Sequence, residues 1–195
     1  MPGNEEVIGA SPWIRDQVGA VLPRHLGANF RAGYIPLPLA SWRLIASNEI
    51  PVLASHAGDL ASDSAPSLKR VNTSTDKKQR IAWAAASVIE IANDFQIPPD
   101  LDTSFPLTFN MRAAMAGATD IPVVSVGLFA DVGDTNFGGN TAAVTGTGVA
   151  TYSVIAASSD LGAFPSSVSI SLTPAAHGTD ILYVYSTWIT YTKRA

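Results

Sequence analysis

The clearest pattern along the chain is an alternation of apolar and polar residues in its C-terminal half. Residues 107–115 place Leu, Phe, Met and Ala at every second position, and residues 167–172 alternate serine with Val, Ile and Leu. A period of two predicts strands with one buried face. The runs at 122–131 and 149–157, which contain many β-branched residues, are interpreted as strands in the same way.

The longest predicted strand covers residues 180–193. Its two faces are both partly apolar, which predicts a central position in a sheet, or cover by a neighbouring element. One predicted face carries Ile181, Tyr183, Tyr185, Thr187, Ile189 and Tyr191, and the other carries Leu182, Val184 and Trp188.

Glycine and proline separate these runs at short, regular intervals. Short strands with such turns indicate an antiparallel sandwich or barrel, and no alternation of strands with helices argues for a parallel sheet. The expected fold class is therefore all-β, an antiparallel jelly-roll-like β-sandwich preceded by an N-terminal arm with one short helix. We expect the arm at 1–33 and the sandwich at 34–195.

The predicted arm helix covers about residues 12–22. Ser11 and Pro12 have the residue types of an N-cap and a first helical position, and Pro23 ends the pattern. A helix of this length is too short to be stable alone in water, so it must dock. The sequence leaves open whether it docks on its own domain or on a partner.

Three segments before the alternating region have other patterns. Residues 34–39 carry Pro36 and Pro38, which predicts extended chain or an edge strand. Residues 54–80 are rich in small and charged polar residues and predict a long irregular connection. For residues 81–95, the alanine content favours a helix, whereas the apolar spacing suits a bent strand.

Composition narrows the classes of partner. Only 14% of the 195 residues are charged, against about 25% in an average soluble domain, while 47% are apolar. Either the core is unusually large for the length, or subunits cover one another, or small residues inflate the apolar fraction. Residues 113–192 contain no Lys or Arg, so we expect no nucleic-acid partner, because phosphate binding needs cations.

The chain contains no cysteine, which excludes disulfides, thiolate metal sites and a cysteine nucleophile. No apolar run approaches the roughly 20 residues of a membrane helix, so no membrane partner is expected. The first residues are acidic and polar rather than a basic start followed by an apolar run. Synthesis in a cytoplasm is the resulting expectation.

Several phrases in the chain resemble, in their order, a family of small structural proteins of tailed bacteriophages. They are Ile35–Arg43, Ala61–Pro66, Val71–Asn72, Thr75–Lys77, Trp83–Ala85, Pro98–Asp102, Gly117–Asp120 and Gly133–Thr141. The resemblance covers about residues 34–192 and is to the capsid decoration, or cement, type. It implies a jelly-roll-like sandwich, a homotrimer, binding to a major capsid protein on the outer surface of the virion, and a strand rather than a helix at 81–95.

Enzyme chemistry has little support in the sequence. His56 and His177 each have an aspartate nearby in the chain, but no Gly-x-Ser-x-Gly elbow accompanies them. Asp100 and Asp102 follow two prolines, which predicts a turn rather than a catalytic pair. The loop 131–136 lacks the spacing of a calcium loop. We expect no enzyme activity, no cofactor and no metal.

The predicted function is capsid decoration, in which the protein stabilises a phage head by binding across its subunits. The interface residues predicted for this role lie in the arm: Trp13, Ile14, Val18, Leu22, Arg24, Phe30 and Arg31. The alternative is a glycan-binding sandwich, a head fibre or host-adsorption module. Its candidate stacking residues are Tyr183, Tyr185, Trp188 and Tyr191.

Overall fold

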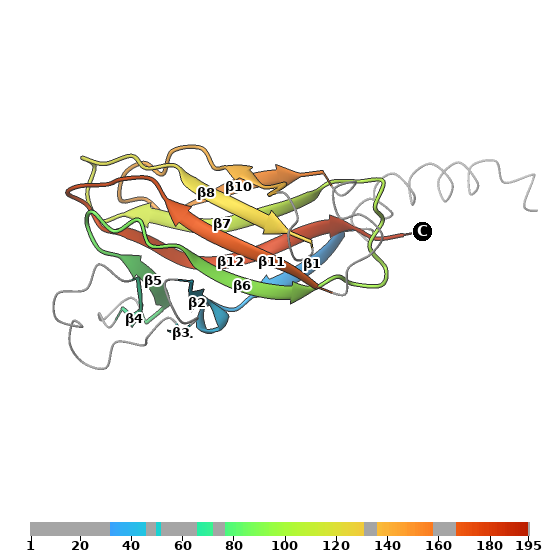
Figure 1. Ribbon diagram of the computed structural model, residues 1–195. Helices are drawn as coiled ribbons and strands as arrows, with labels where there is room; N and C mark the ends of the chain where they lie inside the picture. The colour runs from blue at the N-terminus through green and yellow to red at the C-terminus, as the bar shows by residue number, and fades with distance from the viewer. Residues whose placement is uncertain are drawn as a thin grey trace, which may run out of the picture.

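The computed structural model describes residues 32–45, 50–51, 66–71, 77–130, 136–157 and 167–194. These residues form two antiparallel sheets that pack face to face (Figure 1). Among them the one helical segment is a 3-10 turn, η2 (Leu39–Ser41), and no helix is long and apolar enough to cross a membrane. The expectation of an antiparallel β-sandwich is confirmed.

Each sheet has six strands. The first sheet follows the order β10 (Ala150–Ala156), β7 (Leu107–Met115), β12 (Leu182–Thr192), β5 (Gln79–Trp83) and β4 (Ser67–Arg70), with β1 (Ala32–Leu37) also paired to β12. The second sheet follows the order β3 (Ile50–Pro51), β2 (Arg43–Leu44), β6 (Ile91–Gln96), β11 (Ser167–Pro174), β8 (Val124–Phe129) and β9 (Gly139–Asn140).

From β6 onward the chain crosses repeatedly between the sheets. β6, β8 and β11 belong to the second sheet, whereas β7, β10 and β12 belong to the first. Neighbouring strands within a sheet are therefore mostly distant in sequence, which is the jelly-roll-like arrangement. Because each crossing strand has one face toward the other sheet, the alternating apolar residues of both sheets meet in one core.

The core contains polar hydrogen bonds as well as apolar side chains. Trp42 is fully buried, and its indole Nε1 donates to the Thr187 hydroxyl at 3.2 Å. The same hydroxyl donates to the Leu37 carbonyl oxygen at 2.7 Å. Thr187 can therefore be buried on β12, because its hydroxyl both accepts and donates a hydrogen bond there.

β12 is the central strand of the first sheet, as its two apolar faces predicted. It pairs with β7 on one side and with β5 and then β1 on the other. Its register against β7 shifts between Val184 and Ser186. The shift is a β-bulge, in which one extra residue changes the side of the sheet to which the following side chains point.

Because of the bulge, the two faces predicted for this strand are wrong in part. Before it, Leu182 and Val184 are buried, and after it Thr187, Ile189 and Tyr191 are buried. The prediction that Tyr183 and Tyr185 share a face with these last three residues is wrong. A strict period of two cannot hold across a bulge, and nothing in the residue types of 184–186 marks the extra position.

The predicted irregular connection at 54–80 is wrong for its described part. Residues 67–70 form β4, which pairs antiparallel with β5, and Leu68 is buried on its inner side. These strands lie at one edge of the first sheet and carry several cations. Charged residues are common on edge strands, which explains why a polar composition concealed a hairpin here.

Residues 81–95 form neither a helix nor one bent strand. They contain the end of β5 and most of β6, which belong to different sheets, with a turn between them. Ile81 and Trp83 are buried on β5, and on β6 the buried side chains are those of Ile91, Asn93 and Phe95.

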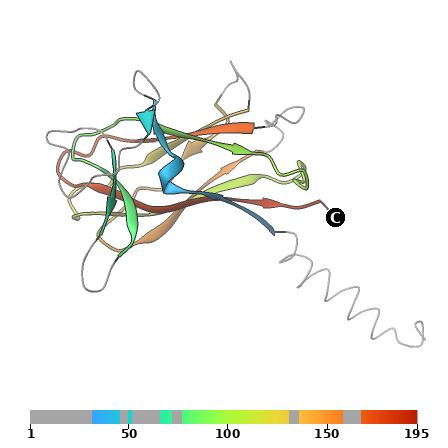
Figure 2. The same ribbon diagram turned by 90° about the horizontal axis from the view of Figure 1, so that it is seen from below.

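β1 begins at Ala32, two residues before the predicted domain boundary, and runs antiparallel beside the end of β12 (Figure 2). Pro36 is tolerated because β12 is the strand with which β1 pairs in the described part of the chain. The ring of Tyr191 lies against Gly33, where any side chain would overlap it. The predicted edge strand is confirmed.

Two loops at one end of the sandwich hold each other through carboxylates. The Asp180 side chain accepts hydrogen bonds from the backbone N–H groups of Thr119 and Asp120, at 2.7 and 3.0 Å. The Asp120 side chain accepts from those of Thr179 and Asp180, at 2.6 and 2.7 Å. This reciprocal clasp joins the β7–β8 and β11–β12 connections.

The clasp makes stability depend on acid pH. The backbone N–H groups of Asp180 and then Thr179 hold the pKa of Asp120 below its ordinary value of 3.8. The ionised carboxylate therefore stabilises the fold above that value, and this contribution is lost as the pH falls through the lower folded pKa.

We expect the thermal unfolding midpoint to fall as the pH decreases below about 4, and Asp120→Asn to reduce that dependence while leaving the circular dichroism spectrum unchanged. The check is a series of melts of both proteins across acid pH. Parallel pH profiles for the two proteins would contradict the role of Asp120.

Candidate functional site

The outer surface of the first sheet carries the largest group of aromatic side chains that point away from the described core. Cross-strand register places Trp188 beside Pro36 on β1 and Asn110 on β7. It places Thr190 beside Tyr34 and Thr108. We call this surface the aromatic face, and define it by Tyr34, Tyr183, Tyr185 and Trp188.

At one end of the aromatic face, two rings stack across neighbouring strands. Tyr34 of β1 and Trp188 of β12 have ring centroids 6.4 Å apart and planes inclined by 29°. Tyr34 is 61% exposed, whereas Trp188 is partly buried beside it. The pair therefore presents the Tyr34 ring and the exposed part of Trp188 to solvent.

At the other end, Arg80 of β5 holds two tyrosines in place. Its guanidinium carbon lies 3.5 Å from the centre of the Tyr183 ring, a cation–π contact. Its Nη1 donates to the Tyr185 hydroxyl at 3.4 Å, and the two tyrosine rings meet edge to face at 6.4 Å. The bulge permits this arrangement, because it leaves Tyr183 and Tyr185 on the same side as Trp188.

A polar strip on β7 runs beside the aromatic residues. Asn110 donates from Nδ2 to the Thr190 hydroxyl at 3.3 Å and accepts from the Ser153 hydroxyl at 2.7 Å. These hydrogen bonds join side chains of β10, β7 and β12, and Asn110 itself is buried among them. Arg112, the next outward residue of β7, is exposed and has no hydrogen-bond or ion-pair partner within the described ranges.

The dimensions of the face suit an extended ligand. Strand geometry separates Tyr183 from Trp188 by roughly 15 Å along β12, with Ser186 and Arg112 between them. The face therefore combines the Tyr34–Trp188 rings at one end, and the tyrosines held by Arg80 at the other, with hydroxyl groups and the Arg112 guanidinium in its middle. Such a surface can stack on weakly polar rings and bond to hydroxyl groups at the same time.

The structure brings together three of the four aromatic residues predicted from the sequence. Tyr183, Tyr185 and Trp188 share the outer face, but Tyr191 is turned into the core and is only 8% exposed. Its hydroxyl donates to Asp100 Oδ1 at 2.9 Å. Tyr191 is therefore not available for stacking, because the bulge reverses the side on which it lies.

Tyr34 and Arg80 were missed as site residues in the sequence. Tyr34 precedes two prolines, and that pattern predicts only an extended strand, not the strand beside which it lies. Arg80 lies at the end of a segment predicted as irregular. Neither residue has a sequence signal for this role, because their positions depend on pairings between strands distant in sequence.

The described residues among those considered for catalysis or metal binding have structural partners, and His56 lies outside the described part of the chain. His177 is fully buried, with Nδ1 2.9 Å from the Ala175 carbonyl oxygen. Asp102 Oδ1 accepts from the backbone of Ser104, and Asn136 Oδ1 from the backbone of Leu128 and Gly138. Within the described ranges, no three acidic or histidine side chains gather into a possible metal site.

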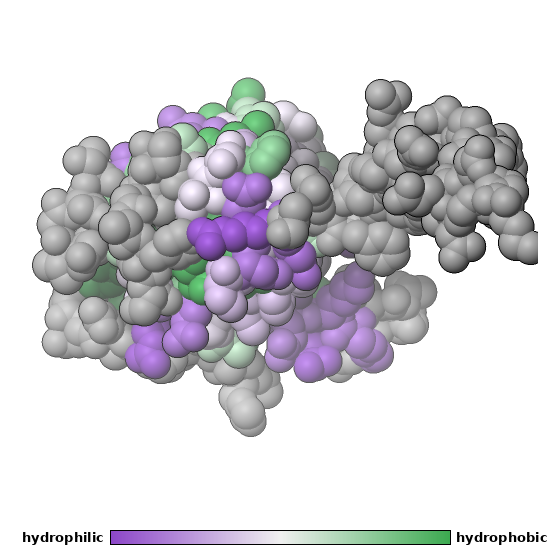
Figure 3. Space-filling model, turned by 90° about the vertical axis from the view of Figure 1, so that its right-hand side faces the viewer, coloured by the Kyte–Doolittle hydropathy of each residue, from purple (hydrophilic) through white to green (hydrophobic). Residues whose placement is uncertain are grey.

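Asp100 lies in a turn, as predicted. Hydrophilic surface is prominent among the described residues on the face of the molecule that Figure 3 shows. Besides the Tyr191 hydroxyl, Asp100 contacts Lys193, whose Nζ lies 3.5 Å from Oδ2. The contacts of Asp100 with Tyr191 and Lys193 join the β6–β7 connection to the end of β12. The role of Asp100 here is to fasten a loop.

The predicted arm interface lies outside the described residues, which begin at Ala32. It comprises Trp13, Ile14, Val18, Leu22, Arg24, Phe30 and Arg31. The arm helix at 12–22 and the part of the 131–136 loop up to residue 135 also lie outside them. The predictions for these segments stay predictions.

No protein-family model and no curated protein matches the chain. Solved structures with a similar arrangement of sheets include the xylan-binding module CBM15, at 14% identity over 84% of this chain and 99% of the module, with a TM-score of 0.47. They also include the family 11 carbohydrate-binding module from Clostridium thermocellum in complex with a β-1,3-1,4-mixed-linked tetrasaccharide, at 14% identity over 84% and 98%, with a TM-score of 0.44.

A third similar structure is TmCBM61 in complex with β-1,4-galactotriose, at 10% identity over 77% of this chain and 88% of that chain, with a TM-score of 0.46. The likeness of all three concerns the β-sandwich alone. Similarity at this level does not carry a ligand or a site residue from one chain to another.

The contact between Tyr191 and Asp100 can be measured by titration. Burial, followed by the hydrogen bond and the negative charge of Asp100, raises the pKa of Tyr191 to about 12. We expect one tyrosine to ionise well above the ordinary value of about 10, and Asp100→Asn to lower its pKa.

Phenolate absorbance during an alkaline titration of the folded protein reports both results, with circular dichroism as the check on folding. Indistinguishable titration curves for Asp100→Asn and the unsubstituted protein would contradict the contact. Asp100→Asn lowers the pKa of Tyr191 because the carboxylate that it removes favours the neutral phenol.

Proposed function

We propose that this protein binds carbohydrate chains on its aromatic face and does not cleave them. The observation that carries the proposal is the pairing of exposed, stacked aromatic rings with a polar strip on one face of a rigid sheet. Tyr34 and Trp188 supply the stacked surface, and the exposed Arg112 of β7 and the Thr190 hydroxyl of β12 lie beside it.

The chemistry of sugars explains why this combination supports binding. A sugar ring has weakly polar C–H surfaces and a rim of hydroxyl groups. Binding sites for such ligands combine flat apolar area with a few placed polar groups. The rings at each end of the aromatic face are separated along the strand, so an extended chain would contact more of the face than a single sugar.

Carboxylates are absent from the described part of the aromatic face. Hydrolysis of a glycosidic bond ordinarily uses two carboxylates that flank the scissile bond. The outward residues of β1, β7, β10 and β12 within the described ranges are Tyr, Trp, Thr, Ser, Asn, Arg, Pro, Ala and Ile. This composition supports binding without catalysis.

Capsid decoration and the homotrimer stay predictions. The residues on which capsid binding would depend lie outside the described part of the chain. No family model matches the chain, so none supports this role. The rival occupant of the aromatic face is a second copy of this chain, because exposed aromatic residues are also enriched at protein interfaces. A single set of variants separates the two.

We expect Trp188→Ala and Tyr34→Ala each to weaken binding to a polysaccharide about tenfold, because each removes one stacking surface. The measurement is affinity electrophoresis in gels containing xylan, β-1,4-galactan or mixed-linkage β-glucan, followed by calorimetry with the best ligand. Phe105→Ala is the matched control, since Phe105 is 45% exposed but lies outside the aromatic face.

Sedimentation of the same proteins tests the rival. A monomer that is retarded by a polysaccharide and released by the two substitutions supports the proposal. No retardation by any polysaccharide on a broad panel would contradict it. An oligomer that Trp188→Ala converts to monomers would instead assign the aromatic face to self-association.

A further inference from the structure

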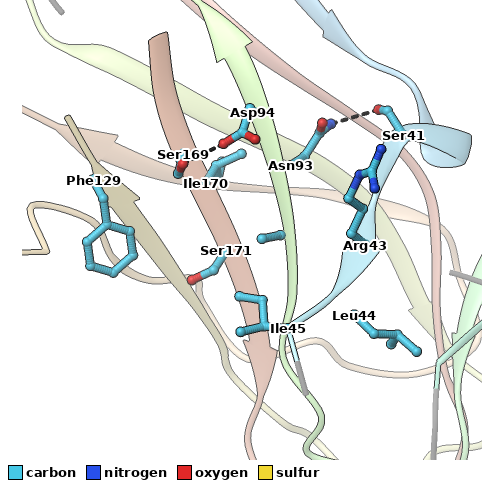
Figure 4. A pocket seen from close by; sticks show the side chains of 11 residues that line it. Ser41, Arg43, Leu44, Ile45, Asn93, Asp94, Phe129, Ser169, Ile170 and Ser171 are labelled. Carbon is cyan, nitrogen blue, oxygen red and sulfur yellow. Dashed lines mark hydrogen bonds between the residues drawn. The ribbon is translucent and has the colours of Figure 1, made fainter. Parts of the chain in front are cut away.

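The second sheet has a cleft on its outer surface, on the opposite side of the sandwich from the aromatic face. Its volume is about 450 Å³. We call it the outer cleft, and Figure 4 shows its lining. The residues important for its chemistry are Arg43, Asp94, Phe129, Ser169 and Ser171, with Ile45 at one side.

The cleft is hollow because small residues follow one another across the sheet. Ala92 of β6, Ser171 of β11 and Gly127 of β8 are paired in one cross-strand row. A side chain at Gly127 would overlap the Ser171 hydroxyl and lie 2.8 Å from the Phe129 ring. The absence of a side chain there keeps the floor low and lets the ring lie over the glycine.

Polar groups stand on both sides of this floor. Arg43 continues the row of small residues on β2, opposite Ala92. Asp94, Ser169 and Phe129 form the adjacent row, and the Ser169 hydroxyl donates to Asp94 Oδ1. The carboxylate is therefore held in place with its second oxygen unused in the described part of the chain.

Arg43 is exposed, and no described residue forms a hydrogen bond or ion pair with it. Next to it, Asn93 donates to the Ser41 hydroxyl at 2.9 Å, which fixes the η2 turn against β6 (Figure 4). A guanidinium with a rigid neighbour and no partner among the described residues is suited to a planar anion, since it can donate two parallel hydrogen bonds to a carboxylate.

We propose that the outer cleft is a second binding site, which takes a sugar residue bearing a carboxylate. The Phe129 ring offers a surface for the C–H face of the sugar. Asp94 and Ser171 offer acceptors and a donor for its hydroxyl groups. Arg43 pairs with the sugar carboxylate, which a neutral sugar lacks.

The size of the cleft agrees with this ligand. Arg43 and Phe129 lie on β2 and β8, three strand spacings apart, which is roughly 14 Å. That distance and the volume are within the range of sites for small organic ligands. A disaccharide would contact the Arg43 guanidinium and the Phe129 ring together.

The two sites are independent because they lie on opposite sheets. The sheets are stacked roughly 10 Å apart, and the side chains of each site point outward from its own sheet. A short saccharide cannot occupy both. The outer cleft therefore rests on the proposed function only in sharing its class of ligand. Carbohydrate binding at either site can be disproved without disproving it at the other.

The test uses two matched disaccharides, one of galacturonic acid and one of galactose, titrated into the whole protein and followed by calorimetry and by NMR of backbone amides. We expect the acidic disaccharide to bind at least tenfold more tightly than the neutral one, and more weakly at high salt. The shifted amides are expected at 92–94, 127–129 and 169–171.

Two arginine variants locate the site. Arg43→Gln is expected to abolish the amide shifts that the acidic disaccharide causes at the outer cleft. Arg112→Gln and Trp188→Ala on the aromatic face are expected to keep those shifts, which separates this site from the proposed function. Both arginines are exposed strand residues, so neither substitution removes core packing.

Three results would overturn the inference. The first is equal affinity for the two disaccharides, and the second is binding of neither. The third is a preference that survives Arg43→Gln but is lost in Arg112→Gln, which would assign the acidic sugar to the aromatic face. If any of these results were found and the protein were still retarded by a neutral polysaccharide, the inference about the outer cleft would be wrong and the proposed function would stand.

Discussion

The structure depends on one irregularity in its central strand. β12 pairs with three other strands, so its side chains contribute to much of the core and of one outer face. The bulge between Val184 and Ser186 lets its two halves bury residues of opposite parity. Without the extra residue, either Leu182 and Val184 or Ile189 and Tyr191 would face solvent, at a cost of about 1.5–3 kcal/mol for each large side chain exposed.

The bulge also explains which part of the architecture follows from sequence. Strands with an uninterrupted period of two, such as 107–115 and 167–172, could be predicted together with their buried faces. Each half of β12 alternates regularly, but the alternation shifts by one residue between the halves. A strict period of two therefore places Tyr191 on the same face as Tyr183, which is wrong. Residue types at a bulge of this kind carry no distinct signal, whereas the packing of both halves fixes it.

Pairing between distant strands could not be predicted for a different reason. The partners of β1 and β5 on β12 are selected by the whole core, and contacts over such sequence separations have no local pattern. Tyr34 and Arg80 belong to the site only through these pairings. The outer cleft is also invisible in sequence, because Ala92, Gly127 and Ser171 become neighbours only in the folded sheet.

The antiparallel pairing of β1 with β12 has a mechanical consequence. Ala32 pairs with Thr192, so the chain enters and leaves the described sandwich at neighbouring points. A force that pulled these two points apart would load the pairs between β1 and β12 one after another, like a zipper, instead of shearing them all together. Tyr34 is the third residue in that order, and the stacked surface that it forms with Trp188 would open while most of the sandwich remained folded.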